Sequence, residues 1–330
     1  MKTKIYLAPM SGVTDLPFRL ISRKFGATHC FFEMLDSNAL LHDHPQNRRL
    51  MKTLKKDSPI SAQLVGADPS IMLDAAQKLT SLLDISFLDI NSACPVKKVT
   101  KKGAGAALLK DPKKLGDMLK KLSSKLKIPL TVKLRTGFNK TNISECIKTS
   151  KICEANGAAI VFIHGRTASQ GYSGDVDYKS IRAVKEALKI PVFGSGNIFS
   201  HLLAKKMLDE TGCDGIIVAR GAQGNPWIFK SIENYLKNGR IPKSVSLSMK
   251  IKTLKQHIVY IEKYKEMGHA NKIGFMGQVA MWYLKGFYNA SKIRERIHNT
   301  RSYEELITLI NDVEGIAGAT DISFSKIQKI

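Results

Sequence analysis

The stretch Phe87-Leu-Asp-Ile90-Asn91-Ser-Ala-Cys94-Pro95 joins a short apolar run to a polar loop. An apolar run of this length with a turn behind it indicates a buried strand. Downstream, Gly103-Ala-Gly105-Ala-Ala-Leu-Leu109 indicates a turn that leads into a helix. A strand, a loop and a helix in this order predict one unit of a parallel α/β sheet, with Cys94 at the open end of the strand.

Eight apolar, β-rich runs alternate with amphipathic stretches in the first two thirds of the chain. The runs predict strands at Ile5 to Ala8, His29 to Phe32, Ile60 to Leu64, Phe87 to Ile90, Leu130 to Leu134, Ala159 to Ile163, Pro191 to Phe193 and Gly215 to Val218. Several of the stretches begin with proline or precede glycine, and they predict helices at Pro69 to Leu83, Pro112 to Lys127, Ile143 to Asn156, Tyr178 to Leu188 and His201 to Thr211. Eight such units predict a closed (β/α)8 barrel, the TIM barrel, and a doubly wound open sheet is the alternative.

In such barrels the chemistry takes place where the strands end. The predicted ends all carry polar or glycine-rich sequence, namely Pro9-Met10-Ser11, Glu33-Met34, Gln63, Asn91 with Cys94, Lys133 with Arg135, His164-Gly165-Arg166, Gly194-Ser195-Gly196-Asn197 and Ala219-Arg220-Gly221. The last two loops suit a phosphate group, because glycine lets the backbone N–H groups come close to it. Each end taken alone would also fit a solvated side chain, and Cys94 alone would fit a small buried hydrophobe.

After about Ile241 the strand-like runs stop and the pattern becomes helical, with candidate helices at Val245 to Met267, Ile273 to Tyr288 and Tyr303 to Val313. We therefore predict a catalytic barrel over residues 1–240 and a small all-helical domain over residues 241–330. The tail is rich in basic residues, which predicts an RNA-holding surface, although the charged outer face of a helix bundle would look the same. These residues are Lys250, Lys252, Lys255, Lys263, Lys265, Lys272, Lys285, Lys292, Arg294 and Arg296.

The chain of 330 residues has 52 Lys and Arg against 28 Asp and Glu, a formal net charge of +24. A charge of this size points to a polyanionic partner, because cations that neutralise phosphates supply most nucleic-acid affinity. Residues 97–140 hold 14 Lys and Arg against Asp111 and Asp117, so half of the net charge follows Cys94 directly. A lysine-rich composition spread over solvated faces is the alternative.

The five cysteines, Cys30, Cys94, Cys146, Cys153 and Cys213, are widely spread and show no CxxC spacing. We expect reduced thiols and no metal site. No apolar run approaches the roughly 20 residues that cross a bilayer, and the N-terminus has no signal-peptide pattern. The sequence thus predicts a cytoplasmic protein without a membrane partner, and we expect a monomer.

Seven motifs together resemble those of the tRNA-dihydrouridine synthases, flavoenzymes that reduce particular uridines of tRNA, and the bacterial dihydrouridine synthase B group most closely. The resemblance runs over nearly the full length. Its carriers are Ala8-Pro-Met-Ser-Gly-Val-Thr-Asp15, Asn91-Ser-Ala-Cys-Pro95 with Lys98-Val99, Gly103-Ala-Gly-Ala-Ala-Leu-Leu109, Val132-Lys-Leu-Arg-Thr-Gly137, Ile163-His-Gly-Arg-Thr167, Gly196-Asn-Ile198 and Ala219-Arg-Gly-Ala-Gln-Gly-Asn-Pro-Trp227.

The resemblance implies FMN in the mouth of the barrel, with NADPH or NADH as the reductant and tRNA as the partner. Pro9, Met10 and Ser11 would line the flavin ring, and Gln63, Lys133 and His164 would contact its polar edge. The phosphate end would be held by Ser195, Gly196, Asn197, Ala219 and Arg220. Cys94 would be the proton donor, and Asn91, Arg135 and Arg166 would lie on the substrate side.

One departure from the family pattern concerns the loop before the thiol. The family usually carries Met-Gly between the asparagine and the cysteine, whereas this chain has Ser92-Ala93. Alanine adopts positive φ less readily than glycine, so the path of this loop is less certain than the flavin site.

Chemistry supports the same function. Saturation of the uracil C5=C6 bond needs a hydride at C6 and a proton at C5, which a reduced flavin and a thiol can supply. Two rival functions stay open: an FMN barrel enzyme acting on a free pyrimidine, such as a dihydroorotate dehydrogenase, and a non-catalytic RNA-binding protein on a barrel scaffold. The first does not need the charge of +24, and the second makes the thiol and the glycine loops accidental.

Overall fold

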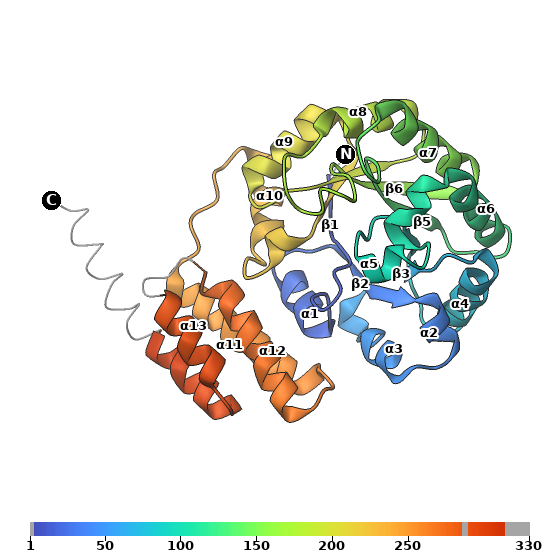
Figure 1. The fold of residues 1–330 in the computed structure, drawn as a ribbon. Helices are drawn as coiled ribbons and strands as arrows, with labels where there is room; N and C mark the ends of the chain where they lie inside the picture. The colour runs from blue at the N-terminus through green and yellow to red at the C-terminus, as the bar shows by residue number, and fades with distance from the viewer. Residues whose placement is uncertain (1–2, 286–289, 314–330) are drawn as a thin grey trace.

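The computed structural model describes residues 3–285 and 290–313. Eight parallel strands close into a barrel in sequence order, and β8 pairs with β1 (Figure 1). This result confirms the (β/α)8 fold and excludes the open sheet. The strands are β1 (Lys4–Leu7), β2 (His29–Asp36), β3 (Ile60–Val65), β4 (Leu88–Asn91), β5 (Leu130–Arg135), β6 (Ala158–His164), β7 (Val192–Ser195) and β8 (Gly215–Val218).

Helices surround the barrel and begin where the sequence offers a cap. Asp68, Asp111 and Asp177 each accept a hydrogen bond from a backbone N–H of the first helical turn. The helices around the barrel are α1 (Leu16–Lys24), α2 (Ser37–Leu41), α3 (Pro45–Leu50), α4 (Pro69–Leu82), α5 (Lys97–Thr100), α6 (Pro112–Ser123), α7 (Ile143–Ala155), α8 (Tyr178–Ala187), α9 (His201–Thr211) and α10 (Ile228–Asn238), with 3-10 turns η1 (Lys55–Asp57), η2 (Gly105–Lys110) and η3 (Arg220–Ala222).

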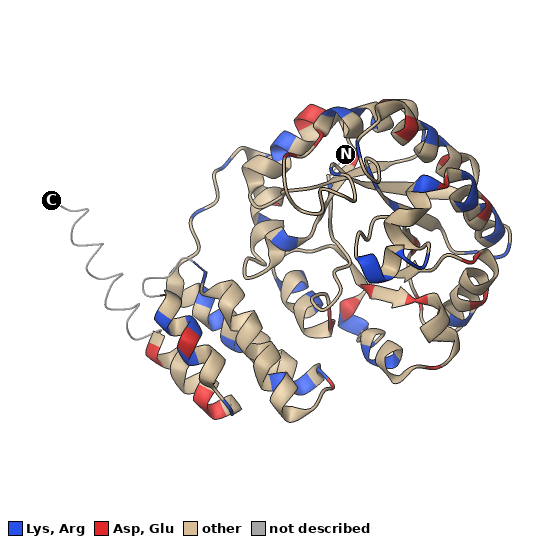
Figure 2. Ribbon diagram, viewed as in Figure 1, with Lys and Arg blue, Asp and Glu red and all other residues tan. Residues whose placement is uncertain are grey.

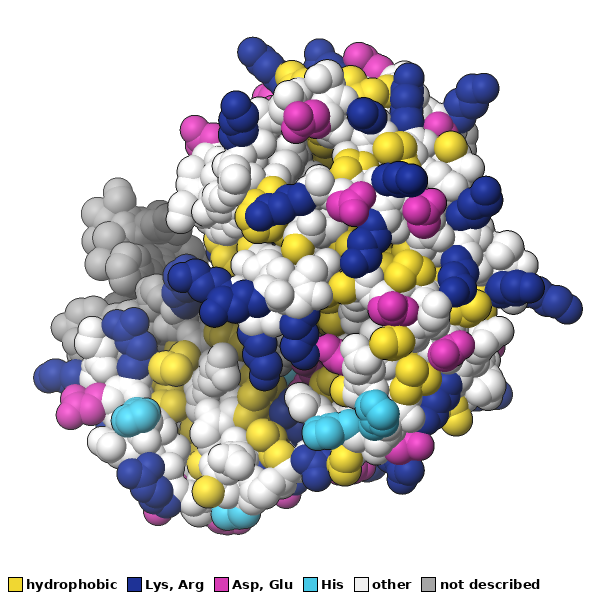
Figure 3. Space-filling model, turned by 45° about the vertical axis from the view of Figure 1, so that its right-hand side comes forward, with side chains coloured by type: hydrophobic (Ala, Val, Ile, Leu, Met, Phe, Trp, Pro, Cys, Tyr) yellow, Lys and Arg dark blue, Asp and Glu magenta, His cyan; other side chains and the backbone are white. Residues whose placement is uncertain are grey.

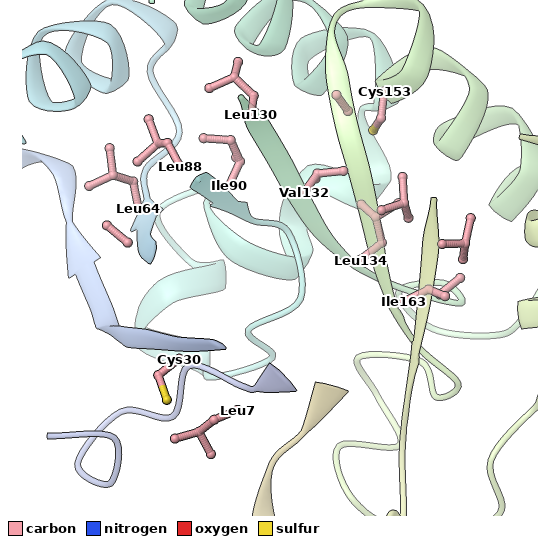
Figure 4. Packing of buried hydrophobic residues seen from close by; sticks show 14 of the residues in the cluster. Leu7, Cys30, Leu64, Leu88, Ile90, Leu130, Val132, Leu134, Cys153 and Ile163 are labelled. Atoms are coloured by element: carbon pink, nitrogen blue, oxygen red, sulfur yellow. The ribbon is translucent and has the colours of Figure 1, made fainter. Parts of the chain in front are cut away.

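Alternate residues of each strand face two different cores, as the two-residue period of a strand requires. Leu88 and Ile90 of β4 belong to the large core between the strands and the helices (Figure 4). A separate cluster of aromatic and aliphatic side chains, including Tyr6, Phe31 and Phe162, fills the interior of the barrel. Asp89 and Asn91 alternate with the outward residues of β4 and therefore face the interior.

The C-terminal helices have a core of their own. They are α11 (Leu247–Tyr264), α12 (His269–Tyr283) and α13 (Ala290–Asn299), followed by helical residues 303–313. Residues 239–246, which have no helix or strand, connect them to α10. The division into domains at residue 240 stays a prediction. Residues 286–288 of the helix predicted at Ile273 to Tyr288, and residues 314–330, lie outside the described residues.

The C-terminal helices pack beside α1 of the barrel (Figure 1). The Phe18 ring of α1 contacts the rings of His257 and Trp282, with centroid distances of 5.8 and 6.0 Å. Lys265 Nζ lies 2.6 Å from Asp15 Oδ2, which joins the end of α11 to the N-cap of α1. Apolar and ionic contacts thus both hold the helices against the barrel.

Seven strands end within two residues of their predictions, and β2 differs the most. β2 continues to Asp36, so Glu33 and Met34 lie inside the strand and not after it. Buried Glu33 accepts a hydrogen bond from the Gly12 backbone N–H in the loop after β1, and burial raises the pKa of its carboxyl group. The predicted strand ends at Phe32 because Glu33 is polar. The sequence alone does not reveal that this carboxylate is buried with a hydrogen-bond donor.

Basic residues are distributed over the barrel and the C-terminal helices (Figure 2). A space-filling view shows Lys and Arg side chains spread over one face of the molecule between apolar areas (Figure 3). Close to Cys94, α5 and the turn after it expose four lysines, Lys97, Lys98, Lys101 and Lys102. The first four lysines of the basic stretch 97–140 are therefore exposed beyond the carboxyl end of β4, whereas Lys133 and Arg135 of the same stretch are buried.

Candidate active site

A cavity of about 380 Å³ opens at the carboxyl ends of the strands. Every predicted site residue except Arg166 lines it: Pro9, Met10, Ser11, Gln63, Asn91, Cys94, Lys133, Arg135, His164, Ser195, Gly196, Asn197, Ala219 and Arg220. The barrel thus brings together predicted residues from seven of its eight strands, all except β2. Their individual roles stay predictions.

The loop that carries Cys94 is fixed by the side chain of Asn91. Asn91 Oδ1 accepts hydrogen bonds from the backbone N–H groups of Ala93 and Cys94, at 3.0 and 2.8 Å. Ala93 does not have positive φ; among the described residues other than glycine, only Asp43 and Asn197 do. The loop therefore follows its path without the glycine that the family usually has there.

Cys94 is half-buried, whereas the other four cysteines are buried. Burial raises the pKa of the Cys94 thiol, against smaller opposing effects of the Val96 backbone N–H and of Arg135. The group at the cavity wall is thus a neutral thiol at neutral pH. A neutral thiol can donate a proton, whereas nucleophilic attack needs the thiolate.

Behind Asn91, a line of buried polar side chains crosses three strands. Asn91 Nδ2 donates to Gln63 Oε1 at 2.8 Å, and Gln63 Nε2 donates to Asp89 Oδ2 at 2.6 Å. Thr131 Oγ1 donates to the other carboxylate oxygen, Asp89 Oδ1, at 2.6 Å. Burial raises the pKa of Asp89 to about 6 against these hydrogen bonds, so the carboxylate is mostly ionised at neutral pH.

The polar wall of the cavity carries positive charge and a neutral imidazole. Burial lowers the pKa of Lys133 to about 8; Arg135 acts in the same direction and Asp89 opposes it. Burial and then the cations around it, Lys133 first, hold the pKa of His164 far below its ordinary value. Lys133 is therefore mainly cationic at neutral pH, and His164 is neutral.

The two arginines on the predicted substrate side have mainly structural contacts. Arg135 donates to the backbone carbonyls of Ala93, Thr167 and Gly171, so it ties the Cys94 loop to the loop after β6. Arg166 is buried outside the cavity lining and donates to the carbonyls of Ser173 and Gly174. The structure therefore does not place Arg166 at the cavity, because its guanidinium group turns back into its own loop.

The loops after β7 and β8 approach each other closely. Gly196 has φ +132°, a conformation that favours glycine, and a Cβ atom on Gly221 would lie 1.8 Å from the Ile198 carbonyl oxygen. Arg220 is near enough to Arg166 to lower the pKa of its guanidinium group, an effect second to burial, and Asp175 only partly offsets it. The loops after β7 and β8 therefore form a narrow backbone cradle, and the arginines beside it leave a net positive charge.

Several residues that line the cavity were not among the predicted site residues. Met34, Tyr172 and Phe199 also line the cavity. Tyr172 is 59% exposed, and Arg220 Cζ lies 4.3 Å from the centre of its ring. Tyr172 lies within the loop after β6, eight residues beyond His164, where no local pattern marks a side chain that returns to the cavity.

Within residues 3–285 and 290–313, no three His, Cys, Asp or Glu side chains are placed to hold a metal ion. The helices of that part of the chain also include none with the length and apolar character needed to cross a membrane.

A closed parallel barrel with a polar cavity at the carboxyl ends of its strands defines the class of (β/α)8-barrel enzymes. A histamine dehydrogenase structure from Rhizobium sp. 4-9 shares this fold, with a TM-score of 0.53 at 12% identity over 76% of this chain and 48% of that one.

The family follows from sequence. The dihydrouridine synthase model matches residues 6–316. The tRNA-dihydrouridine synthase B of Pasteurella multocida (strain Pm70) is 36% identical over 94% of this chain and 92% of its own length, and that of Vibrio vulnificus (strain CMCP6) is 35% identical over 97% of both chains. A probable tRNA-dihydrouridine synthase of Rickettsia conorii (strain ATCC VR-613 / Malish 7) is 34% identical over 90% of this chain and 89% of its own. The chain belongs to the dihydrouridine synthase family and is an oxidoreductase.

Proposed function

We propose that this protein reduces the C5=C6 bond of particular uridines in tRNA, with FMN as its cofactor and NADPH or NADH as the reductant. The observation that carries the proposal is a neutral, half-buried thiol in the same cavity as a glycine-lined, cationic cradle. Membership of the family argues against a non-catalytic RNA-binding protein. The names of these relatives state tRNA as the molecule in which dihydrouridine is made, and this favours tRNA over a free pyrimidine as the substrate.

The cavity residues fit FMN. The closely packed loops after β7 and β8 offer backbone N–H groups and a positive charge to a phosphate. The residues that would hold it are Ser195, Gly196, Asn197, Ala219 and Arg220. Gln63, Lys133 and His164 offer hydrogen-bonding groups for the polar edge of the ring, and Pro9, Met10 and Ser11 offer its wall. Bound FMN in its reduced form would supply the hydride for uracil C6.

The side chains of the protein would supply the proton and balance the charge. Cys94, held by Asn91, would donate its thiol proton to C5. Negative charge develops on the uracil carbonyl oxygen as the double bond is reduced. Lys133 has no hydrogen-bond partner among the described residues that would compete for its ammonium group, so we assign the electrostatic role to it and not to Arg135, which is occupied by three carbonyls.

The position of the cavity sets a condition on the RNA. A base inside folded RNA cannot reach the end of a barrel, so the target nucleotide must leave its stack. The exposed lysines of α5 and of the following turn stand beside Cys94 and would hold the neighbouring phosphates. With tRNA as its substrate, we expect the enzyme to act in the cytoplasm.

Mapping of dihydrouridine in tRNA tests the proposal. Cells that lack this protein should lose dihydrouridine at one or more positions, and the gene in trans should restore it. Purified protein should be yellow and bind about one FMN per chain. Unchanged dihydrouridine at every position, or folded protein that takes up no added FMN, would contradict the proposal.

A further inference from the structure

Asp89 is a buried ionisable group that has no part in the proposed mechanism. It is 1% exposed, it faces the barrel interior from β4, and it does not line the cavity itself, although its hydrogen-bond partner Gln63 does. Strand register places Asp89 beside Gln63 of β3 on one side and beside Thr131 of β5 on the other. A buried carboxylate is costly unless every oxygen has a donor, so its presence between two strands requires a reason.

The donor and the acceptor of each hydrogen bond between Asp89 and the Cys94 loop are determined by the groups at the two ends of the line. An ionised carboxylate accepts and cannot donate, so Gln63 must turn its NH2 group toward Asp89 and its carbonyl oxygen toward Asn91. At the other end, backbone N–H groups donate and cannot accept, so Asn91 must turn its carbonyl oxygen toward Ala93 and Cys94. The orientations of the Gln63 and Asn91 amides are therefore both determined, by the carboxylate at one end of the line and by the backbone N–H groups at the other.

We propose that Asp89 is a positioning residue that acts through Gln63 and Asn91 to hold the Cys94 thiol at the cavity wall. The inference rests on the proposed role of Cys94 as proton donor. Thr131 completes the arrangement by occupying the second carboxylate oxygen. Without the acceptor at position 89, the amide of Gln63 loses its fixed orientation, and the hold of Asn91 on the Cys94 backbone weakens.

Two substitutions separate the hydrogen bond from the charge. Asp89→Leu and Asp89→Asn remove the same charge and keep nearly the same shape, but only asparagine keeps an acceptor for Gln63. The Thr131 hydroxyl can accept from the new amide as well as donate, so asparagine can satisfy both neighbours. A difference between the two variants therefore reports the acceptor alone.

The readout is the rate at which iodoacetamide alkylates each cysteine of the purified protein, followed by mass spectrometry. We expect Cys94 to react about fivefold faster in Asp89→Leu, as the loss of one hydrogen-bonded restraint implies, and within about twofold of wild type in Asp89→Asn. The four buried cysteines report on global unfolding, and their rates should stay unchanged. Thr131→Val leaves Asp89 Oδ1 without its donor but keeps the acceptor for Gln63, so it is the matched control, and its Cys94 rate should stay within about twofold of wild type.

A kinetic measurement links the position of the thiol to the reaction. Oxidation of the reduced enzyme by tRNA should be about 10- to 100-fold slower in Asp89→Leu than in Asp89→Asn, because a displaced reacting group costs rate of this order. If Asp89→Leu does not fold, Gln63→Met breaks the same line of hydrogen bonds at its middle and should raise the Cys94 rate likewise.

Equal Cys94 alkylation in the Leu and Asn variants, or a fivefold rise in the Asn variant too, would overturn the inference. The alkylation test needs no turnover, so it stands apart from the proposed function. If tRNA from the deletion strain kept all of its dihydrouridine while the alkylation pattern held, the proposed function would fall and the hold on the Cys94 loop would remain.

Discussion

Cys94 differs from the other cysteines both in exposure and in neighbours, and this difference makes its role testable. Cys94→Ala should still bind FMN and accept reducing equivalents from NADPH, but the oxidation of reduced enzyme by tRNA should slow by about 100- to 10,000-fold, the usual contribution of a general acid. Single-turnover absorbance of the flavin measures both half-reactions separately.

Cys153→Ala is the matched control, because this buried thiol lies on α7 outside the cavity lining and should affect stability at most. If the tRNA-dependent rate is unchanged in Cys94→Ala, Cys94 is not the proton donor and another cavity residue must have this role.

The protonation state of the same thiol predicts a pH dependence. Burial raises the pKa of Cys94, so the proton that the reaction needs is present throughout the neutral range and is lost only as the pH rises through that raised value. The rate of the tRNA half-reaction should therefore fall on the alkaline side. A nucleophilic cysteine would give the opposite slope, with a rate that rises as thiolate forms.

Arg166 shows at the same scale why some site residues cannot be placed from sequence. An arginine after the sixth strand looks like a group that binds an anion or a substrate, yet its Nε and Nη2 atoms donate to the carbonyls of Ser173 and Gly174. Its direction depends on the course of a loop that no local pattern determines. Cys94 and His164 reach the cavity because they lie just after β4 and at the end of β6, and Lys133 reaches it from within β5, two residues before the strand ends; the apolar runs of the sequence mark all three strands.

The strands and helices of the barrel were predictable to within a few residues where a single physical signal governs them. Apolar runs mark strands that are buried on both faces, and β8 has the predicted bounds Gly215–Val218. Where a polar residue is buried with a partner the signal fails, as at Glu33 in β2. The short helix α1 was not among the predicted helices.

The close approach of the loops after β7 and β8 gives a prediction for these elements. Gly221→Ala places a methyl group against the Ile198 carbonyl, so the loops must separate and FMN affinity should fall by at least about tenfold, or 1.4 kcal/mol. Fluorescence titration of flavin-free protein measures this.

Gly212→Ala is the control for the replacement of a glycine by alanine without a steric clash. Gly212 ends α9 with φ +64° and has no atom within 4 Å of an added Cβ, so the variant should lose about 1 kcal/mol of stability and keep its FMN affinity. If both variants bind FMN with equal affinity, the loops after β7 and β8 do not take part in flavin binding. Lys133→Ala and Arg220→Ala should also weaken flavin retention.

At the scale of the whole molecule, the net charge of +24 predicts a salt-dependent affinity for tRNA. Replacing Lys97, Lys98, Lys101 and Lys102 by alanine should flatten the plot of log affinity against log salt by roughly 0.7 to 0.9 for each phosphate that the protein no longer neutralises. Reduction of the flavin by NADPH should not change. Lys125 and Lys127 precede β5, at the opposite end of the barrel, and their replacement should leave the slope unchanged.

The basic residues of the C-terminal helices need their own set of variants. We expect replacement of Lys250, Lys252, Lys255, Arg294 and Arg296 to flatten the slope as well. If affinity and slope stay unchanged for this set and fall for the lysines of α5, the C-terminal helices are a structural cap and the RNA lies along the Cys94 side of the barrel.

Trp282 packs against both the barrel core and the core of the C-terminal helices, and the Phe18 ring meets it from α1. Neither part can melt without exposing apolar surface of the other, so heat should unfold them together. Calorimetry should show one transition in which the calorimetric and van't Hoff enthalpies agree. Trp282→Ala removes one of the contacts that join the two parts, beside the Phe18–His257 ring contact and the Lys265–Asp15 ion pair, so the van't Hoff enthalpy should fall below the calorimetric enthalpy as the coupling weakens.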